Sequence, residues 1–304
     1  MKLYAPGYYT EFSCIADRCR HSCCIGWEID IDEATARHYA TLSAPYADTI
    51  RESIETEDGA PHFRLCEGER CPHLDEHGLC RIILSLGEGH LCDICREHPR
   101  FYHTTRQGME VGLGMACEEA CRIVLSSDGY GRFVAIGEEP GEAVQTGFDA
   151  TAHRERIYAV LSDRARPYDE RLADIAQAYG VSLTARTDTA WRELLGSLEY
   201  LDEAHRALFN CYSSRTQQAG AAETVLERAL AYFIYRHVSD AADADELCAA
   251  VGFSLLCERL LASLIEAREV RSFEAIVELA RTVSEELEYS EDNTETLKQA
   301  FWML

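Results

Sequence analysis

Apolar residues recur at helical spacing through the second half of the chain. Val225, Leu226, Ala229, Leu230 and Phe233 fall at i, i+1, i+4, i+5 and i+8, which places them on one face of a helix. Similar periodicity predicts further helices over 153–163, 168–179, 189–209, 244–266, 271–288 and 294–303. The pattern therefore predicts a helical bundle over residues 151–304.

The first 125 residues lack this periodicity. Their apolar runs are short and are separated by Cys, His, Gly and Pro; one helix is predicted at 32–40, where Asp32 is suited to be the N-cap. Residues 126–150 are rich in Gly and acidic side chains and are expected to form a linker. We predict a mainly α protein with an irregular cysteine-rich, metal-binding N-terminal domain at 1–125, followed by an all-α helical bundle.

The charge of the chain excludes one class of partner. Its 29 basic and 53 acidic residues give a formal net charge of −24, whereas a general nucleic-acid binder needs positive charge to displace counterions. Only Lys2 and Lys298 are lysines. The N-terminal residues have no apolar core of a secretory signal, and the most apolar stretch, 247–265, is interrupted by Glu258 and Arg259. We expect a cytoplasmic protein with no transmembrane segment.

The cysteines are concentrated at one end of the chain. Eleven of the 14 lie between Cys14 and Cys121. In a reducing cytoplasm such a cluster indicates a metal or iron–sulfur site rather than a disulfide framework. The only C-x2-C pair is Cys92–Cys95, and Gly26 stands where a C-x3-C-x2-C loop would need its third cysteine. The spacing leaves zinc and an iron–sulfur cluster open as alternatives.

A set of ordered motifs resembles the bacterial flagellin lysine N-methylase family, and more loosely the bacterial cysteine-cluster proteins described as zinc- or iron-chelating. The motifs are Phe12-Ser-Cys14, Cys19-x3-Cys23-Cys24-Ile-Gly-Trp27, Cys71-Pro-His-Leu-Asp75, Gly78-Leu-Cys80-Arg81, Cys95-x3-Pro99-Arg100 and Cys117-Glu118. The resemblance covers about residues 9–120. It implies an S-adenosylmethionine-dependent protein-lysine N-methyltransferase that acts on flagellin and carries a [4Fe–4S] cluster.

The same resemblance implies the metal ligands. Carried over position by position, they are Cys14, Cys19, Cys23, Cys24, Cys71, Cys80, Cys95 and Cys117. Cys66, Cys92 and Cys121 fall outside the pattern and are interpreted as packing thiols or substitute ligands. Of these three, Cys92 has the best claim to be a ligand because it shares a turn with Cys95. The catalytic residues and the S-adenosylmethionine pocket cannot be assigned from the motifs.

Other chemistry-bearing residues have a structural interpretation beside the functional one. His73, His77 and His98 are possible ligands, with hydrogen-bonded or solvated roles favoured; Asp75 and Glu118 are possible bases, with local caps and turns favoured. Trp27 is interpreted as a lid over the site, and Tyr4, Tyr8, Tyr9 and Tyr102 as packing residues or an aromatic channel. Gly112-x-Gly114 is more typical of a turn than of a nucleotide-binding loop.

Two alternatives to a methyltransferase remain open from the sequence. One is a non-catalytic zinc- or iron-binding protein that handles metal and uses its helical half to recruit a partner. The other is a redox sensor with labile thiols. An assay of methyl transfer to flagellin separates the methyltransferase interpretation from both of these alternatives.

Overall fold

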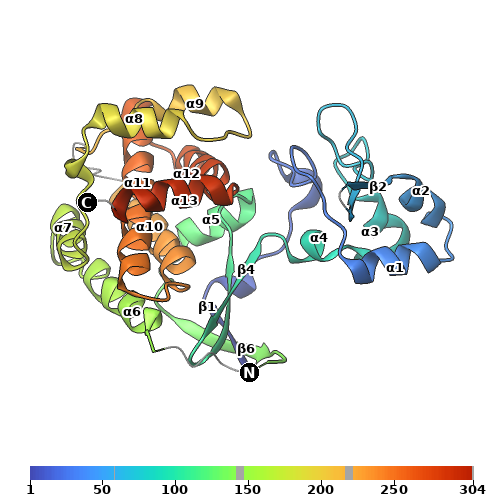
Figure 1. Ribbon diagram of the computed structural model, residues 1–304, viewed down its shortest axis with the longest axis horizontal. Coiled ribbons are helices and arrows are strands. Elements are labelled where there is room, and N and C mark those ends of the chain that lie inside the picture. Colours follow the sequence, from blue (N-terminus) through green and yellow to red (C-terminus); the bar gives the residue numbers. More distant parts are fainter. Residues whose placement is uncertain (58, 142–146, 216–221, 303–304) are drawn as a thin grey trace. The chain divides into compact units, whose positions relative to one another are not determined.

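The computed structural model describes residues 1–57, 59–141, 147–215 and 222–302, and it divides into two compact units. Unit 1 combines Met1–Phe12 with Phe101–Leu304, and unit 2 is Ser13–Arg100 (Figure 1). Part of the expected linker, 142–146, and position 303 of the last expected helix lie outside the described residues.

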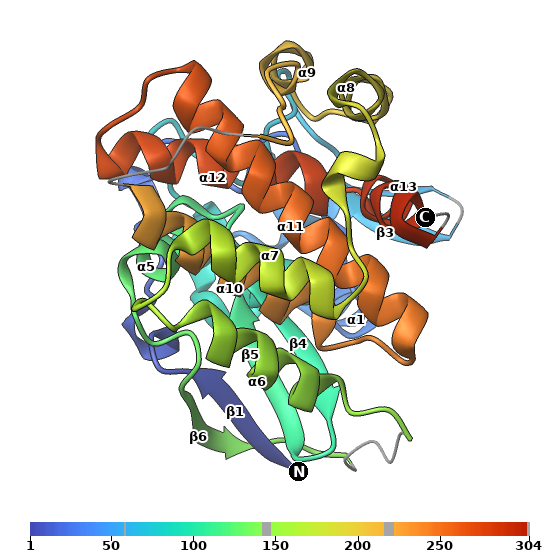
Figure 2. The same ribbon diagram turned by 90° about the vertical axis from the view of Figure 1, so that its left-hand side faces the viewer.

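Unit 1 contains a four-stranded mixed sheet in the order β4-β5-β1-β6. Strand β1 (Lys2–Pro6) runs parallel to β5 (Gly108–Leu113), with Leu3 opposite Met109, and antiparallel to β6 (Phe133–Glu138). Strand β4 (Arg100–Thr105) forms the edge beside β5. Figure 2 shows these strands together at one end of unit 1, below its helices.

Apart from α5 (Glu118–Ser126), which the sequence did not predict, the helices of unit 1 follow the predicted pattern. The others are α6 (Ala150–Leu161), α7 (Tyr168–Ala178), α8 (Asp188–Gly196), α9 (Glu203–Phe209), α10 (Glu223–Val238), α11 (Ala244–Ala267), α12 (Phe273–Glu288) and α13 (Glu291–Trp302). Side-chain caps begin several of them: Asp149 accepts from Ala152 N–H at 3.0 Å, and Asp243 accepts from Asp245 and Glu246 N–H at 2.9 Å. The mainly α prediction is confirmed.

One predicted helix is two helices. The expected 189–209 segment divides into α8 and α9, because Asp202 caps α9 through Ala204 N–H at 2.8 Å. The buried Glu286 also accepts from the backbone N–H of Leu201 at 2.8 Å, which holds the connection away from helical geometry. Apolar periodicity does not reveal such a break.

The core of unit 1 is large and continuous. Helices α10 and α11 lie at its centre, with fully buried Leu230, Phe233, Leu256 and Leu260 in one cluster with α5, α6, α7, α12 and α13 (Figure 2). Helix α11 is long and apolar enough to cross a membrane by length and composition, but 89% of its most apolar window is buried inside the protein. Those properties suit the central helix of a globular core.

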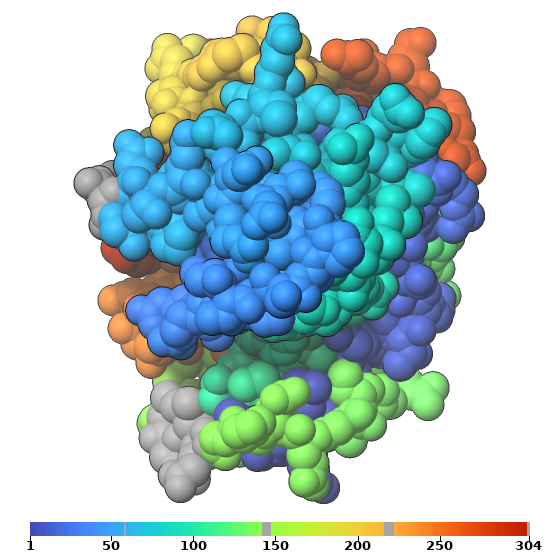
Figure 3. All heavy atoms as spheres, turned by 90° about the vertical axis from the view of Figure 1, so that its right-hand side faces the viewer, coloured from blue at the N-terminus to red at the C-terminus, as the bar shows by residue number. Residues whose placement is uncertain are grey.

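Unit 2 is smaller and has short elements. They are α1 (Glu33–Thr41), α2 (Ala47–Glu52), the β2 (Ile54–Glu57) and β3 (Ala60–Phe63) hairpin, α3 (Arg81–Leu86) and α4 (Asp93–Glu97). Asp32 caps α1 as predicted, accepting from Thr35 N–H at 2.8 Å. Its other carboxylate oxygen accepts from Asp93 N–H at 3.0 Å, so α1 lies beside the start of α4. Figure 3 faces this unit and shows its blue and teal segments side by side.

The structure divides the chain differently from the expected 1–125, 126–150 and 151–304. Residues 1–12 and 101–125 belong to unit 1, because β1, β4, β5 and α5 build its sheet and core. Strand β6 lies within the expected linker and pairs with β1. The elements described within 151–304 are all helices, as predicted. Unit 1 as a whole is not all-α, because these helices share it with the mixed sheet built from residues 2–138, in which β1 pairs with strands more than 100 residues away.

Candidate metal centre

Seven of the eight predicted ligand cysteines lie in unit 2. These are Cys14, Cys19, Cys23, Cys24, Cys71, Cys80 and Cys95. The eighth, Cys117, is the N-cap residue of α5 in unit 1. Unit 2 therefore carries the densest group of candidate ligands.

Five thiols of unit 2 gather on a single apolar cluster, which also contains Ile29, Ile31, Tyr39, Ile50, Phe63 and Ile82. We call these five the thiol cluster: Cys24, Cys71, Cys80, Cys92 and Cys95. Cys71 and Cys92 are buried in it, with 6% and 1% of their surfaces exposed, and the other three pack against it. Four of the five are predicted ligands. The fifth, Cys92, is outside the family pattern.

A hairpin-like turn brings Cys71 and Cys80 together. Leu74 forms a β-bridge with Cys80, and Arg81 N–H donates to His73 O at 2.8 Å. Asp75 holds the turn, since its Oδ1 accepts from His77 and Leu79 N–H at 2.8 Å. Asp75 thus has the turn-forming role favoured from the sequence.

A backbone hydrogen bond attaches Cys24 to this turn, and the starts of two helices carry the other thiols. Cys71 N–H donates to Cys24 O at 2.8 Å, which places the double-cysteine segment beside it. Cys80 directly precedes α3 and Cys92 directly precedes α4, while Cys95 lies within α4. Three separate chain segments therefore contribute to the thiol cluster.

The pKa values show that the thiols act on one another. The neighbouring Cys23 thiol lowers the pKa of Cys24 to about 7, and the Cys95 thiol lowers the pKa of Cys92. Burial, together with the charges of Cys24, Cys80 and Cys92, raises the pKa of Cys71 to about 12. Several thiolates in one apolar site repel each other, and a bound cation removes that repulsion.

His73 lies beside the thiol cluster but is already committed to hydrogen bonds. Its Nδ1 is 3.0 Å from Tyr46 Oη and its Nε2 is 2.9 Å from Ser53 Oγ. Burial lowers its pKa to about 4, so the ring is neutral at pH 7. The structure confirms the hydrogen-bonded interpretation of His73, which packs edge-on against Phe63.

The other singled-out residues of unit 2 lie around this site or at the surface. The rings of Trp27 and His98 meet edge to face at 5.8 Å, and burial lowers the pKa of His98 to about 4. The lid role of Trp27 stays a prediction. His77 is exposed, with Nε2 3.6 Å from Glu76. Cys14 and Cys66 are exposed and lie outside the apolar cluster.

Several sequence candidates belong to unit 1 instead. Cys121 is fully buried in the helical core and its Sγ donates to Val277 O at 3.5 Å, which confirms it as a packing thiol. Tyr8 is buried in the same core, Tyr4 lies in β1, Tyr9 packs against the core, and Tyr102 in β4 is 43% exposed. Gly112 is a strand residue of β5 rather than a turn residue.

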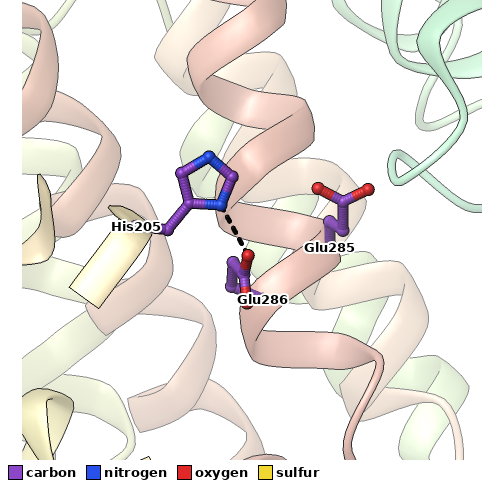
Figure 4. A group of neighbouring side chains, drawn as sticks. All are labelled: His205, Glu285 and Glu286. Carbon is purple, nitrogen blue, oxygen red and sulfur yellow. Dashed lines mark hydrogen bonds and ion pairs between the residues drawn. The ribbon is translucent and has the colours of Figure 1, made fainter. Parts of the chain in front are cut away.

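A second group of potential ligands lies in unit 1, where His205, Glu285 and Glu286 place their ligand atoms within 4.8 Å of one another. Figure 4 shows the His205 ring pointing at Glu286, with Nδ1 2.5 Å from Oε1. Glu286 also accepts backbone N–H groups, and Glu285 lies 2.7 Å from Arg281. These partners already engage both carboxylates, and we interpret the group as an ion-pair network that joins α9 to α12.

The donor set of the thiol cluster fits a thiolate-bound metal. Sulfur ligands suit both tetrahedral zinc and iron–sulfur clusters, and each takes four cysteines. The thiol cluster offers five, in an apolar surround that limits water access. The family pattern leaves Cys92 out, but its C-x2-C spacing with Cys95 marks it as the best further candidate.

Comparison with known proteins points to the same family as the motifs. No family model and no solved structure matches the chain. The Lysine-N-methylase of Salmonella typhimurium is 32% identical over 131 residues, which are 40% of this chain and 32% of that protein. The Flagellar biosynthetic protein FliU of Salmonella muenchen is 31% identical over 140 residues, which are 44% of this chain and 81% of FliU.

The two matches differ in how much of each relative they cover. The match spans about a third of the length of the lysine-N-methylase, but most of FliU. With that coverage, and with its ordered cysteine motifs, the chain belongs to the flagellin lysine N-methylase family.

Proposed function

We propose that the chain is a cytoplasmic, S-adenosylmethionine-dependent protein-lysine N-methyltransferase that acts on flagellin and carries a cysteine-bound [4Fe–4S] cluster. The observation that carries the proposal is the similarity to a protein named Lysine-N-methylase together with one named Flagellar biosynthetic protein. The thiol cluster supports the metal part, because it offers the soft ligands that an iron–sulfur cluster requires. Zinc is the alternative metal.

The thiol cluster of unit 2 is the part of the chain that supports a metal site. The ligands would come from the thiol cluster, in which Cys24, Cys71, Cys80 and Cys95 combine the family pattern with a position on the apolar cluster. When bound, an iron–sulfur cluster supplies one-electron chemistry, whereas zinc only joins chain segments. The chain's own contribution is to fix the thiols: the Asp75 turn sets Cys71 against Cys80, and the His73 hydrogen bonds hold this turn against α2.

Methyl transfer to lysine sets requirements that any site in this protein must meet. The amine must be neutral, aligned with the sulfonium, and shielded from water. The strongly acidic chain favours approach of a basic surface, which fits a lysine-bearing substrate. We expect methylation to weaken as the salt concentration rises, because salt screens this attraction.

The direct test is transfer of a labelled methyl group from S-adenosylmethionine to purified flagellin, using protein prepared without oxygen. Label on flagellin lysines supports the enzyme. No label with the metal retained contradicts the methyltransferase and favours a metal-binding protein without activity. The observation that favours this second candidate is that the match covers only 32% of the length of the lysine-N-methylase.

The metal needs its own measurement. Iron and sulfide in equal amounts, with broad visible absorption, support the [4Fe–4S] cluster. A colourless protein with stoichiometric zinc overturns the cluster but leaves the methyltransferase to be judged by the transfer assay.

A further inference from the structure

The nine cysteines of unit 2 fall into two sets by their surroundings. Five form the thiol cluster on the apolar core of the unit. The other four lie outside that core: Cys14, Cys19, Cys23 and Cys66. Cys92 stands out among the five because it lies outside the family's motif, yet it is the most deeply buried, with 1% of its surface exposed.

A buried cysteine is often only a packing residue, and unit 1 contains two examples. Cys121 and Cys257 are fully buried among helices, and the Cys121 thiol donates to a backbone carbonyl. Cys92 has different neighbours. It shares one apolar cluster with Cys71, and Cys24, Cys80 and Cys95 pack against the same cluster.

The local backbone also holds Cys92 beside a motif cysteine. Cys92 is the residue before α4, and Cys95 lies in the first turn of that helix. The segment that contains Cys92 is fixed from both sides, since Asp93 N–H donates to Asp32 at 3.0 Å and Tyr39 Oη donates to His90 O at 2.6 Å.

We propose that Cys92 is a ligand of the metal centre in unit 2, beside the motif cysteines of the thiol cluster. The proposal rests on the metal part of the proposed function. A four-coordinate centre uses four of the five thiols, and the burial of Cys92 on the shared cluster, together with its place in the same turn as Cys95, argues that it is not the spare one. Cys92 and Cys95 thus form a two-ligand turn that joins α4 to the Cys71–Cys80 turn.

Alkylation of the full chain tests this assignment without any variant. The purified protein, with its metal, is treated with iodoacetamide before and after the metal is removed, and each cysteine is followed by mass spectrometry. We expect Cys92 to be protected until the metal leaves, as Cys71 and Cys95 are, while exposed Cys66 reacts in both states. Equal reaction of Cys92 in both states overturns the proposal.

A matched pair of variants gives a second readout. Cys92→Ser should lower the metal bound per chain by about tenfold or more, whereas Cys66→Ser should leave it unchanged. Equal metal in both variants overturns the proposal, even where methyl transfer to flagellin is intact. A wild-type chain that binds no metal overturns both this assignment and the metal part of the proposed function, while the transfer assay judges the activity separately.

Discussion

The two units of this protein are stabilised in different ways. Unit 1 buries a continuous core of long helices around α10 and α11, with a mixed sheet at one end. Unit 2 has short helices, a two-stranded hairpin and a small apolar cluster in which two of the eight buried members are cysteines. An apolar core of that size rarely stabilises a fold alone, and small units often add a metal.

Because of this difference, we expect a change in one unit to have other effects than a change in the other unit. Substitutions in unit 1 should change its stability through packing and buried ion pairs, and should leave the metal in place. Changes to the thiol cluster should act on unit 2 first. The predictions below test that separation, from the largest expected effect to the smallest.

Removal of the metal should have the largest effect. Without the metal, the thiol cluster loses the bonds that join three chain segments. The free energy of unfolding of unit 2 therefore falls. We expect hydrogen exchange to rise across residues 13–100 after chelation, while the amides of α10 and α11 keep their protection. Unchanged exchange in α1 and α3 after complete metal loss would show that unit 2 folds on its apolar cluster alone.

In unit 1, the largest single effect should come from a buried ion pair. Arg154 binds Glu110 through two bonds of 2.6 and 2.8 Å, and both residues are buried. Arg154→Ala leaves the carboxylate without its partner and should cost about 3–5 kcal/mol of unfolding free energy. The measurement is chemical denaturation of unit 1, with metal content expected to stay constant.

A surface ion pair supplies the control for this substitution. Arg166 lies 2.6 Å from Asp174, but both side chains are substantially exposed. Arg166→Ala should leave the unfolding free energy almost unchanged, because solvent screens an exposed pair. Similar losses from the two arginine variants would contradict the role given to burial.

Sequence and structure agree best where the elements are long and amphipathic. The helices at 168–179, 244–266 and 271–288 appear nearly as predicted because one-sided apolar spacing is a local property. The sheet was missed because β1 pairs with β5 more than 100 residues away, so neither strand shows its partner in its own sequence. The sequence also did not predict Gly112 as a strand residue. A glycine that packs against aromatic rings and a glycine in a turn cannot be distinguished from the sequence alone.

The candidate site was predicted in part. The family motifs identified Cys24, Cys71, Cys80 and Cys95, which the fold brings onto one apolar cluster. Spacing alone does not show that Cys92 joins them while Cys14 lies outside. That distinction depends on the Asp75 turn and on the contact between α1 and α4, which involve residues far apart in the chain.

Gly112 offers a sharper test of packing in unit 1. A Cβ at this position would lie 2.2 Å from Phe101 Cζ and 2.6 Å from Tyr235 Cε1, so both rings would have to move. Gly112→Ala should cost about 1–3 kcal/mol in thermal or chemical unfolding. At Gly196, the last residue of α8, nothing lies within 4 Å of such a Cβ, and Gly196→Ala should stabilise unit 1 by about 0.4–1 kcal/mol. Equal destabilisation by both would contradict the ring contacts.

The smallest expected effect separates proton binding in unit 1 from metal binding in unit 2. The hydrogen bond to Glu286 raises the pKa of His205 above its usual value near 6.5. A raised pKa in the folded state means that the protonated pair stabilises unit 1 fully below the unfolded pKa, and that this contribution is lost as the pH rises through the folded pKa. His205→Gln should therefore destabilise unit 1 by about 1 kcal/mol or less at pH 5.5, since the side chain is partly exposed, and by a smaller amount at pH 9. Unfolding curves of the variant and the parent at both pH values measure the difference. A larger loss at pH 9 than at pH 5.5 would reverse the sign of the linkage and would show that the neutral ring, rather than the ion pair, holds α9 to α12.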